Sequence, residues 1–110
     1  MEPLTFDYEN LHLRVDRGVF EQFDLDSSAS SFRTPLAWLG ATVHFKKPDR
    51  PGTLYVGVVR DPRAALYGTD RLGFRYATSP SFQVPPGDEA LFRAYFTQVA
   101  LLADRAVVTA

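Results

Sequence analysis

The sequence predicts a mainly β fold: a partly open antiparallel β-barrel or sandwich of about seven strands, capped by one C-terminal amphipathic α-helix. Short segments that alternate apolar and polar residues recur at intervals of about 8–12 residues. Turn-forming residues separate these segments, which indicates consecutive hairpins. Only residues 85–104 follow the helical period instead. A chain of 110 residues fits one domain, so we expect a single domain over residues 1–110.

The first strands are expected on either side of a tight turn. Residues 10–16, NLHLRVD, place Leu, Leu and Val on one face and His, Arg and Asp on the other, as in a half-buried strand. Arg17 and Gly18 then signal the turn. Residues 19–25, VFEQFDL, are rich in strand formers, but Phe20 breaks their alternation. We therefore expect a bulge or a strand covered on both faces.

The middle of the chain predicts two further strands and a proline-rich turn. Residues 26–31 are small and polar, as in a loop, and residues 32–34 form a short strand that Pro35 stops. Residues 36–47 contain a second alternating strand, and residues 48–52 form a turn with two prolines and a glycine. The inward face of this strand is expected to be Ala41, Val43 and Phe45.

The next strands are expected to complete the sheet. Residues 53–60 are apolar at both parities, which is typical of a strand covered on both faces. Residues 61–70 form a long connection. Residues 71–77 alternate again, and residues 79–84 form a last short strand. The inward positions of these two strands are expected to be Leu72, Phe74, Tyr76, Phe82 and Val84.

The C-terminal helix is expected to seal the open side of the sheet. Pro85 and Pro86 end the last strand, and Gly87 or Asp88 is a suitable N-cap. With about 100° per residue, the apolar side chains that follow fall within an arc of about 140°. Such an arc is the buried face of an amphipathic helix. Its members are Leu91, Phe92, Tyr95, Phe96, Val99, Leu102 and Ala103.

Two longer motifs support this fold by resemblance. Residues 32–45, FRTPLAWLGATVHF, and residues 82–99, FQVPPGDEALFRAYFTQV, look like two parts of a bacterial pleckstrin-homology-like (PH-like) domain. The first resembles its short strand, pause and longer strand, and the second its last strand and capping helix. The resemblance implies a domain that binds lipid, peptide or protein. The positions that carry the first motif are Arg33, Pro35, Leu36 and Leu39.

Composition limits the functional classes. A formal net charge of −1 argues against a nucleic-acid partner, whose binding surface would be basic. The absence of cysteine excludes disulfides, thiol nucleophiles and cysteine-ligated metals. The first ten residues, MEPLTFDYEN, do not resemble a signal peptide, and no apolar run approaches the roughly 18 residues of a membrane span. We therefore expect a cytoplasmic protein without stable membrane insertion.

The sequence contains no pattern that predicts catalysis. His12 and His44 fall on the polar faces of their strands, without the spacing of a metal site, and are expected to be surface residues. The serines within residues 27–31 lack a G-x-S-x-G context, and the glycines form no phosphate-binding loop. We therefore expect no catalytic, metal-binding or cofactor-binding residues, no cofactor and no enzyme activity.

A few residues are candidates for binding. Lys46, Lys47 and Arg50 form the only local basic cluster, at the tip of an expected hairpin. Leu101 lies off the buried helical face and is a candidate for a small apolar patch. Trp38 is expected in the core, with an interface anchor as the alternative.

These features favour a non-catalytic protein-interaction module, which binds another protein or a second copy of itself. Binding is expected at free sheet edges, at the outer side of the helix or at loops 46–53 and 61–70. The alternative is a module that binds the anionic headgroup of a lipid. The PH-like resemblance implies basic residues around the first hairpin loop, where Arg14 and Arg17 are the nearest match and a lysine is missing. The cations that would serve the alternative are Arg14, Arg17, Lys46, Lys47 and Arg50.

Overall fold

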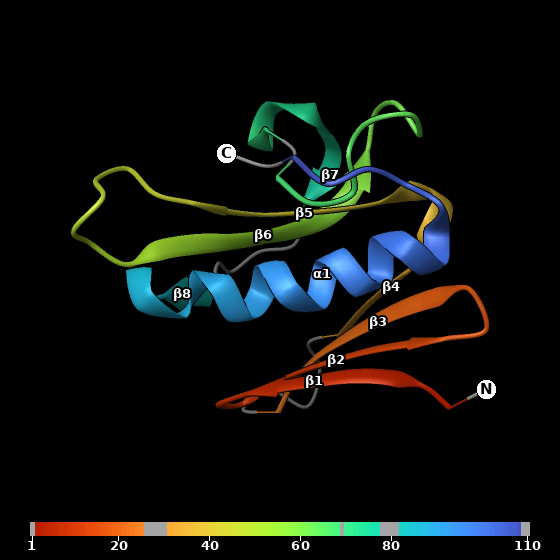
Figure 1. The fold of residues 1–110 in the computed structure, drawn as a ribbon, viewed down its shortest axis with the longest axis horizontal. Helices are drawn as coiled ribbons and strands as arrows, with labels where there is room; N and C mark the ends of the chain where they lie inside the picture. Colours follow the sequence, from red (N-terminus) through yellow and green to blue (C-terminus); the bar gives the residue numbers. More distant parts are fainter. Residues whose placement is uncertain (1, 26–30, 69, 78–81, 109–110) are drawn as a thin grey trace.

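The computed structural model describes residues 2–25, 31–68, 70–77 and 82–108. Within these ranges the chain forms two antiparallel sheets, each of four strands, and a C-terminal helix (Figure 1). The first sheet is a meander in which each strand pairs with the next one in sequence. Its strands are β1 (Leu4–Tyr8), β2 (Leu11–Asp16), β3 (Val19–Asp24) and β4 (Ser31–Pro35).

The second sheet is arranged around its longest strand. That strand pairs with β5 along one edge and with both β7 and β8 along the other. A 3₁₀ helix, η1 (Leu36–Trp38), carries the chain from the first sheet to the second, and another, η2 (Arg71–Gly73), precedes β7. The strands are β5 (Leu39–His44), β6 (Gly52–Val59), β7 (Phe74–Ala77) and β8 (Phe82–Val84).

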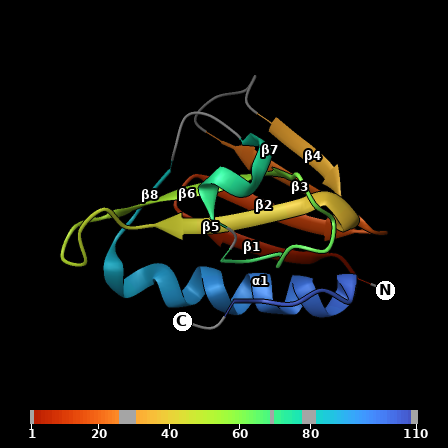
Figure 2. The ribbon, with the colours of Figure 1, turned by 90° about the horizontal axis from the view of Figure 1, so that it is seen from above.

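The C-terminal helix closes the space between the sheets, as expected. A short 3₁₀ turn, η3 (Pro86–Asp88), leads into α1 (Glu89–Ala103). In Figure 1 the helix lies between the two sheets, and the view from above shows it running along one side of the strands (Figure 2). Its buried face joins one hydrophobic core with residues of both sheets, among them Leu13 and Val56. That face consists of Phe92, Tyr95, Phe96, Val99 and Ala100.

The turn between β2 and β3 confirms the sequence prediction. Arg17 and Gly18 have φ angles of 54° and 77°, the pair of positive angles that a type I′ hairpin turn requires. Of the two alternatives for residues 19–25, the bulge is excluded for β3, because its pairing with both neighbours runs without a shift. Phe20 points into the core while Phe23 lies beside the His12 ring on the other face. The broken alternation therefore reflects a strand that carries apolar side chains on both faces.

The strand β1 was not among those expected from the sequence. Its burial alternates, with Leu4, Phe6 and Tyr8 half-buried and the two residues between them exposed. Phe6 packs edge-on against Phe92, with ring centroids 5.0 Å apart. The same alternation was present in the sequence as LTFDY, so the signal for this strand existed but was short.

The prediction that Leu72, Phe74 and Tyr76 share an inward face is wrong. Leu72 lies in η2 and is 74% exposed. The register of β6 and β7 shifts between Val58 and Val59, so Phe74 pairs with Val59 while Tyr76 pairs with Val58. A bulge of this kind turns neighbouring alternate residues to opposite faces. Phe74 is consequently buried, whereas Tyr76 is exposed.

The helix is rotated relative to the expected orientation. Leu91 and Leu102 were expected to be buried but are 51% and 50% exposed, whereas Ala100 is buried. On a helical wheel the buried arc is shifted by about 40° toward Ala100. A small side chain at that position permits a close approach of the helix to the core, and the two leucines are left at the edge of the interface.

The outer edge of β5 is covered by other parts of the same chain. The backbone N–H of Ala41 donates to Leu66 at 2.8 Å, and the N–H of Gly68 donates to the carbonyl of Ala41 at 2.9 Å. The N–H of Val108 in turn donates to Tyr67 at 3.0 Å. An added strand therefore has no free backbone partner at Ala41.

Candidate functional site

An apolar groove lies where the C-terminal end of α1 meets the first sheet. It consists of two neighbouring hollows of about 440 and 310 Å³, which share Glu2, Leu4 and Leu102 as lining residues. We call it the helix-end groove. Its apolar lining comes from β1, β2, η1 and α1, and comprises Leu4, Val15, Leu36, Leu101 and Leu102.

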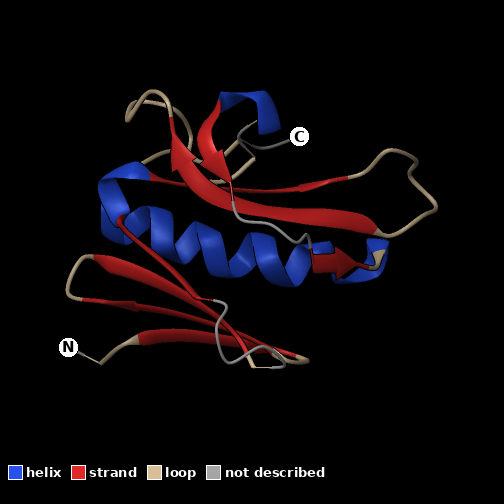
Figure 3. Ribbon diagram, turned by 180° about the vertical axis from the view of Figure 1, so that it is seen from behind, coloured by secondary structure: helices blue, strands red, loops and turns tan. Residues whose placement is uncertain are grey.

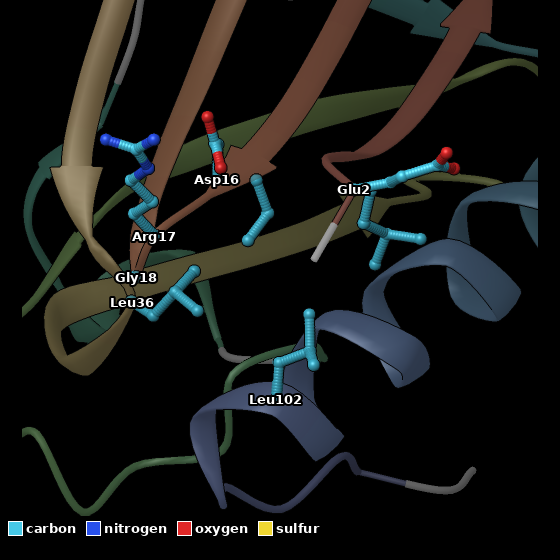
Figure 4. A pocket seen from close by; sticks show the side chains of 8 residues that line it. Glu2, Asp16, Arg17, Gly18, Leu36 and Leu102 are labelled. Carbon is cyan, nitrogen blue, oxygen red and sulfur yellow. The ribbon is translucent and has the colours of Figure 1, made fainter.

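The groove exists because the helix and the first sheet diverge at this end. Leu36 begins η1, at the point where the chain leaves the first sheet, and its N–H donates to the carbonyl of Gly18 at 2.9 Å. Leu36 and Leu102 point toward each other across the hollow (Figure 4). Leu102 remains 50% exposed, so the two side chains do not fill the space between them.

Charged residues of both signs surround the helix-end groove. Asp16 and Arg17, at the β2–β3 turn, line one end of it, and Glu2 lies at the junction of the two hollows. In Figure 4, Asp16 and Arg17 direct their charged ends away from Leu102. Arg14 is an ion-pair partner of Asp16, with Nη2 and Oδ2 3.1 Å apart. Arg14 therefore serves an ion pair within β2, and Arg17 is the cation that borders the groove.

Leu101 lies off the buried face of the helix, as expected, whereas Trp38 does not lie in the core. Leu101 is 77% exposed and lines the smaller hollow of the groove together with Gln98. Trp38 is 37% exposed, so the prediction that it belongs to the core is wrong. It is the last residue of η1, where each of three successive residues points in a different direction, and Leu36 takes the inward one.

The three cations of the expected basic cluster lie together at the other end of the molecule. Lys46, Lys47 and Arg50 line a hollow of about 500 Å³ at the tip of the β5–β6 hairpin. Figure 3 shows this loop projecting past the start of α1. The turn with Arg17 lies at the opposite end of the long axis, near the end of the helix (Figures 1 and 2). The five candidate cations therefore do not line one common hollow.

The two histidines lie in separate surroundings. His12 Nδ1 is 2.5 Å from the carboxylate of Asp7 on the neighbouring strand, and His44 lines the hollow of the β5–β6 hairpin. Among the residues that the structure describes, no group of three or more histidine and acidic side chains is placed to hold a metal ion. In the same residues, no helix has the length and apolar character that a bilayer-spanning segment needs.

Two interactions that the sequence did not suggest fix the ends of the helix. Tyr8 donates a hydrogen bond to the carboxylate of Asp88, and this bond, with burial, raises the pKa of Tyr8 to about 12. The Arg105 guanidinium donates to carbonyl groups of three residues from two other segments, at distances of 2.5–2.9 Å, and burial lowers its pKa. Neither interaction has a sequence signal, because each joins positions distant in the chain. The carbonyls belong to Leu36, Leu39 and Ala64.

Comparisons of the chain with protein-family models, curated proteins and solved structures gave no match.

Proposed function

We propose that the chain is a non-catalytic protein-interaction module whose helix-end groove binds apolar side chains of another protein. The observation that carries this proposal is the pair of adjoining hollows lined by leucines of both the helix and the first sheet. A concave apolar surface with polar residues around it is the usual form of a site that receives the anchor side chains of a partner.

Exposure of the leucines supports the same proposal. Leu101 and Leu102 are adjacent in sequence and 77% and 50% exposed, and both line the smaller hollow. Single exposed leucines are common on protein surfaces, but adjacent ones beside a hollow favour an interface. Charged residues of both signs at the border of the groove, Glu2, Asp16 and Arg17, would favour a bound segment with complementary charges.

The proposal also includes the fold family, because the sequence resembles PH-like domains. Two four-stranded antiparallel sheets followed by a C-terminal helix are the arrangement that the resemblance implied, and they support assignment to a PH-like domain. In this assignment the binding surface is the helix-end groove, which the β2–β3 turn borders at one end. The expected location is the cytoplasm, so a cytoplasmic lysate is the appropriate source of partners.

The substitution Leu101→Lys tests the proposal, with Leu72→Lys as a matched control. The two leucines are 77% and 74% exposed, so both variants are expected to fold with stability within about 0.5 kcal/mol of the wild type. Affinity capture from a cytoplasmic lysate should recover proteins with the wild type and L72K that L101K loses. A direct binding measurement with the recovered protein should then show weaker binding by L101K alone.

Two other results would change the conclusion. If L101K retains every protein that the wild type captures, or if the wild type captures none specifically and forms no dimer, the groove is not the binding surface. If sedimentation velocity shows a concentration-dependent dimer that L101K abolishes and L72K preserves, the occupant is a second copy of the chain.

A further inference from the structure

The tip of the β5–β6 hairpin carries a cluster of positive charges. Lys46, Lys47 and Arg50 line one hollow of about 500 Å³. In the described part of the chain, no ion pair includes any of the three, and Asp49 in the same turn also forms none. Cations that converge on one hollow attract an anion more strongly than the same charges dispersed over a surface.

The backbone of the hairpin holds two of these cations close together. The N–H of Arg50 donates to the carbonyl of Lys47 at 3.2 Å, which closes a four-residue turn. Pro48 occupies the second position of that turn, where its fixed φ angle favours this geometry. The ends of such a turn have Cα atoms within about 7 Å of each other, so Lys47 and Arg50 are neighbours before any ligand binds.

The base of the hairpin is also fixed. A Cβ atom added to Gly52 would lie 2.8 Å from the ring of Phe45 and 2.9 Å from Val43. The aromatic ring therefore packs directly against the backbone at the point where β6 begins. This contact anchors the loop and reduces the conformational freedom that ligand binding would otherwise have to remove.

Neutral donors lie beside the cations in the same hollow. Gln83 Nε2 of β8 donates to Thr53 Oγ1 of β6 at 3.3 Å. The hydroxyl of Thr53 accepts that bond, so its own hydrogen is available to donate to a ligand. His44 lines the hollow as well. The hairpin thus combines ammonium, guanidinium and hydroxyl donors around one space.

We propose that this hairpin site binds a phosphate group. Ammonium groups neutralise phosphate as point charges, whereas a guanidinium binds two of its oxygens at once, and the hydroxyl adds a further hydrogen bond. The phosphate belongs either to a soluble compound or to a lipid headgroup at a membrane surface, since both present the same oxygens. The site lies at the end of the molecule opposite the helix-end groove and does not depend on the protein-interaction proposal.

Two probes and one matched pair of variants test the hairpin site. The probes are sodium pyrophosphate, followed by amide NMR shifts, and phosphatidylcholine vesicles with or without phosphatidic acid, followed by cosedimentation. Lys46→Ala/Lys47→Ala removes two cations from the site, while Arg71→Ala/Arg75→Ala removes two exposed cations from the region of β7. All four side chains are exposed, so both variants are expected to fold, and thermal melts serve as the control for folding.

We expect at least one of the two probes to bind. Binding of pyrophosphate should shift the amide NMR signals of residues 46–53. The hairpin variant should weaken it by about tenfold or more, because charge-assisted hydrogen bonds are lost, and the β7 variant by less than about twofold. Binding of pyrophosphate assigns the site to soluble phosphates, and binding only of phosphatidic acid vesicles assigns it to headgroups. The proposal is overturned if neither probe binds, or if both variants lose affinity equally, which would indicate attraction to net charge alone.

Discussion

The two ends of α1 pack against the first sheet in different ways. Near its start, Phe92 has its ring centroid 5.0 Å from that of Phe6 and 5.1 Å from that of Tyr8. Tyr8 also contacts Phe82 of the second sheet, at 5.7 Å, so aromatic rings join all three layers. Near the end of the helix, Leu102 faces the first sheet across an unfilled hollow.

This difference shows how side-chain size decides where the interface is sealed. Aromatic rings are wide enough to bridge diverging elements, and edge-to-face contacts give them additional stabilisation. Leucines such as Leu102 and Leu36 are smaller and leave a groove where the elements separate. The same helix therefore closes the core at one end and forms a candidate binding surface at the other.

The largest expected effect on stability comes from replacing one side chain at each end of α1 with alanine. Phe92→Ala removes a fully buried ring and should lower the free energy of unfolding by about 3–5 kcal/mol. Leu102→Ala removes a side chain that is 50% exposed and should cost about 1 kcal/mol or less. Urea denaturation of both variants measures the difference. Equal losses would contradict the distinction between a sealed and an open end.

A smaller effect is expected from the hydrogen bond that fixes the start of the helix. Tyr8→Phe removes the bond to Asp88 and should cost about 1 kcal/mol near neutral pH. The pKa of Tyr8 is about 12 in the folded protein and about 10 in the unfolded chain. The stabilisation from this hydrogen bond is therefore fully present below pH 10. It should disappear as the pH rises toward 12, because the unfolded chain loses the proton first.

The measurement for Tyr8→Phe is a series of denaturation curves from pH 8 to about 12 for the wild type and the variant. Burial also raises the pKa of Tyr67 and Tyr95, but both proteins retain these residues. The difference between the two proteins therefore isolates Tyr8. A difference that stays constant over this range would show that Tyr8 contributes no pH-dependent stability.

The smallest expected effect is at the end of the helix. Asp104 has a φ angle of 54°, and the N–H of Arg105 donates to the carbonyl of Ala100 at 2.9 Å, as in a helix that ends in a left-handed residue. Asp104→Gly should raise the free energy of unfolding by about 0.5–1 kcal/mol, because glycine adopts this conformation without strain. Asp104→Ala is the control, since it removes the carboxylate but keeps the Cβ. Equal effects of the two substitutions would show that charge, and not backbone strain, is responsible.

The sequence predicted which segments form strands and helices more completely than which of their side chains are buried. The alternation at Leu11, Leu13 and Val15 identified β2, because one face of an isolated period-two segment must be buried. For residues 71–77 the same argument failed, because the bulge at Val58 and Val59 on the partner strand decides which face each side chain takes. The bulge lies in the partner strand, so the sequence of residues 71–77 carries no pattern that reveals it.

The candidate site residues divide in the same way. Lys46, Lys47 and Arg50 were found from the sequence because a short turn brings neighbours in the chain together. Leu101 was found from its angle on the helix, but its companions Leu4 and Leu36 were not. The three leucines come from three distant segments, and only packing of the helix against the first sheet brings them into one groove.

Local periodicity and turn chemistry therefore determined that this chain forms paired strands and one amphipathic helix, since these depend on residues a few positions apart. The tertiary structure alone decided the rotation of α1, the gap beside Leu102 and the separation of the β2–β3 turn from the β5–β6 hairpin. These features depend on how closely side chains from distant segments fill the space between layers. Close packing is a property of the assembled core and not of any one segment.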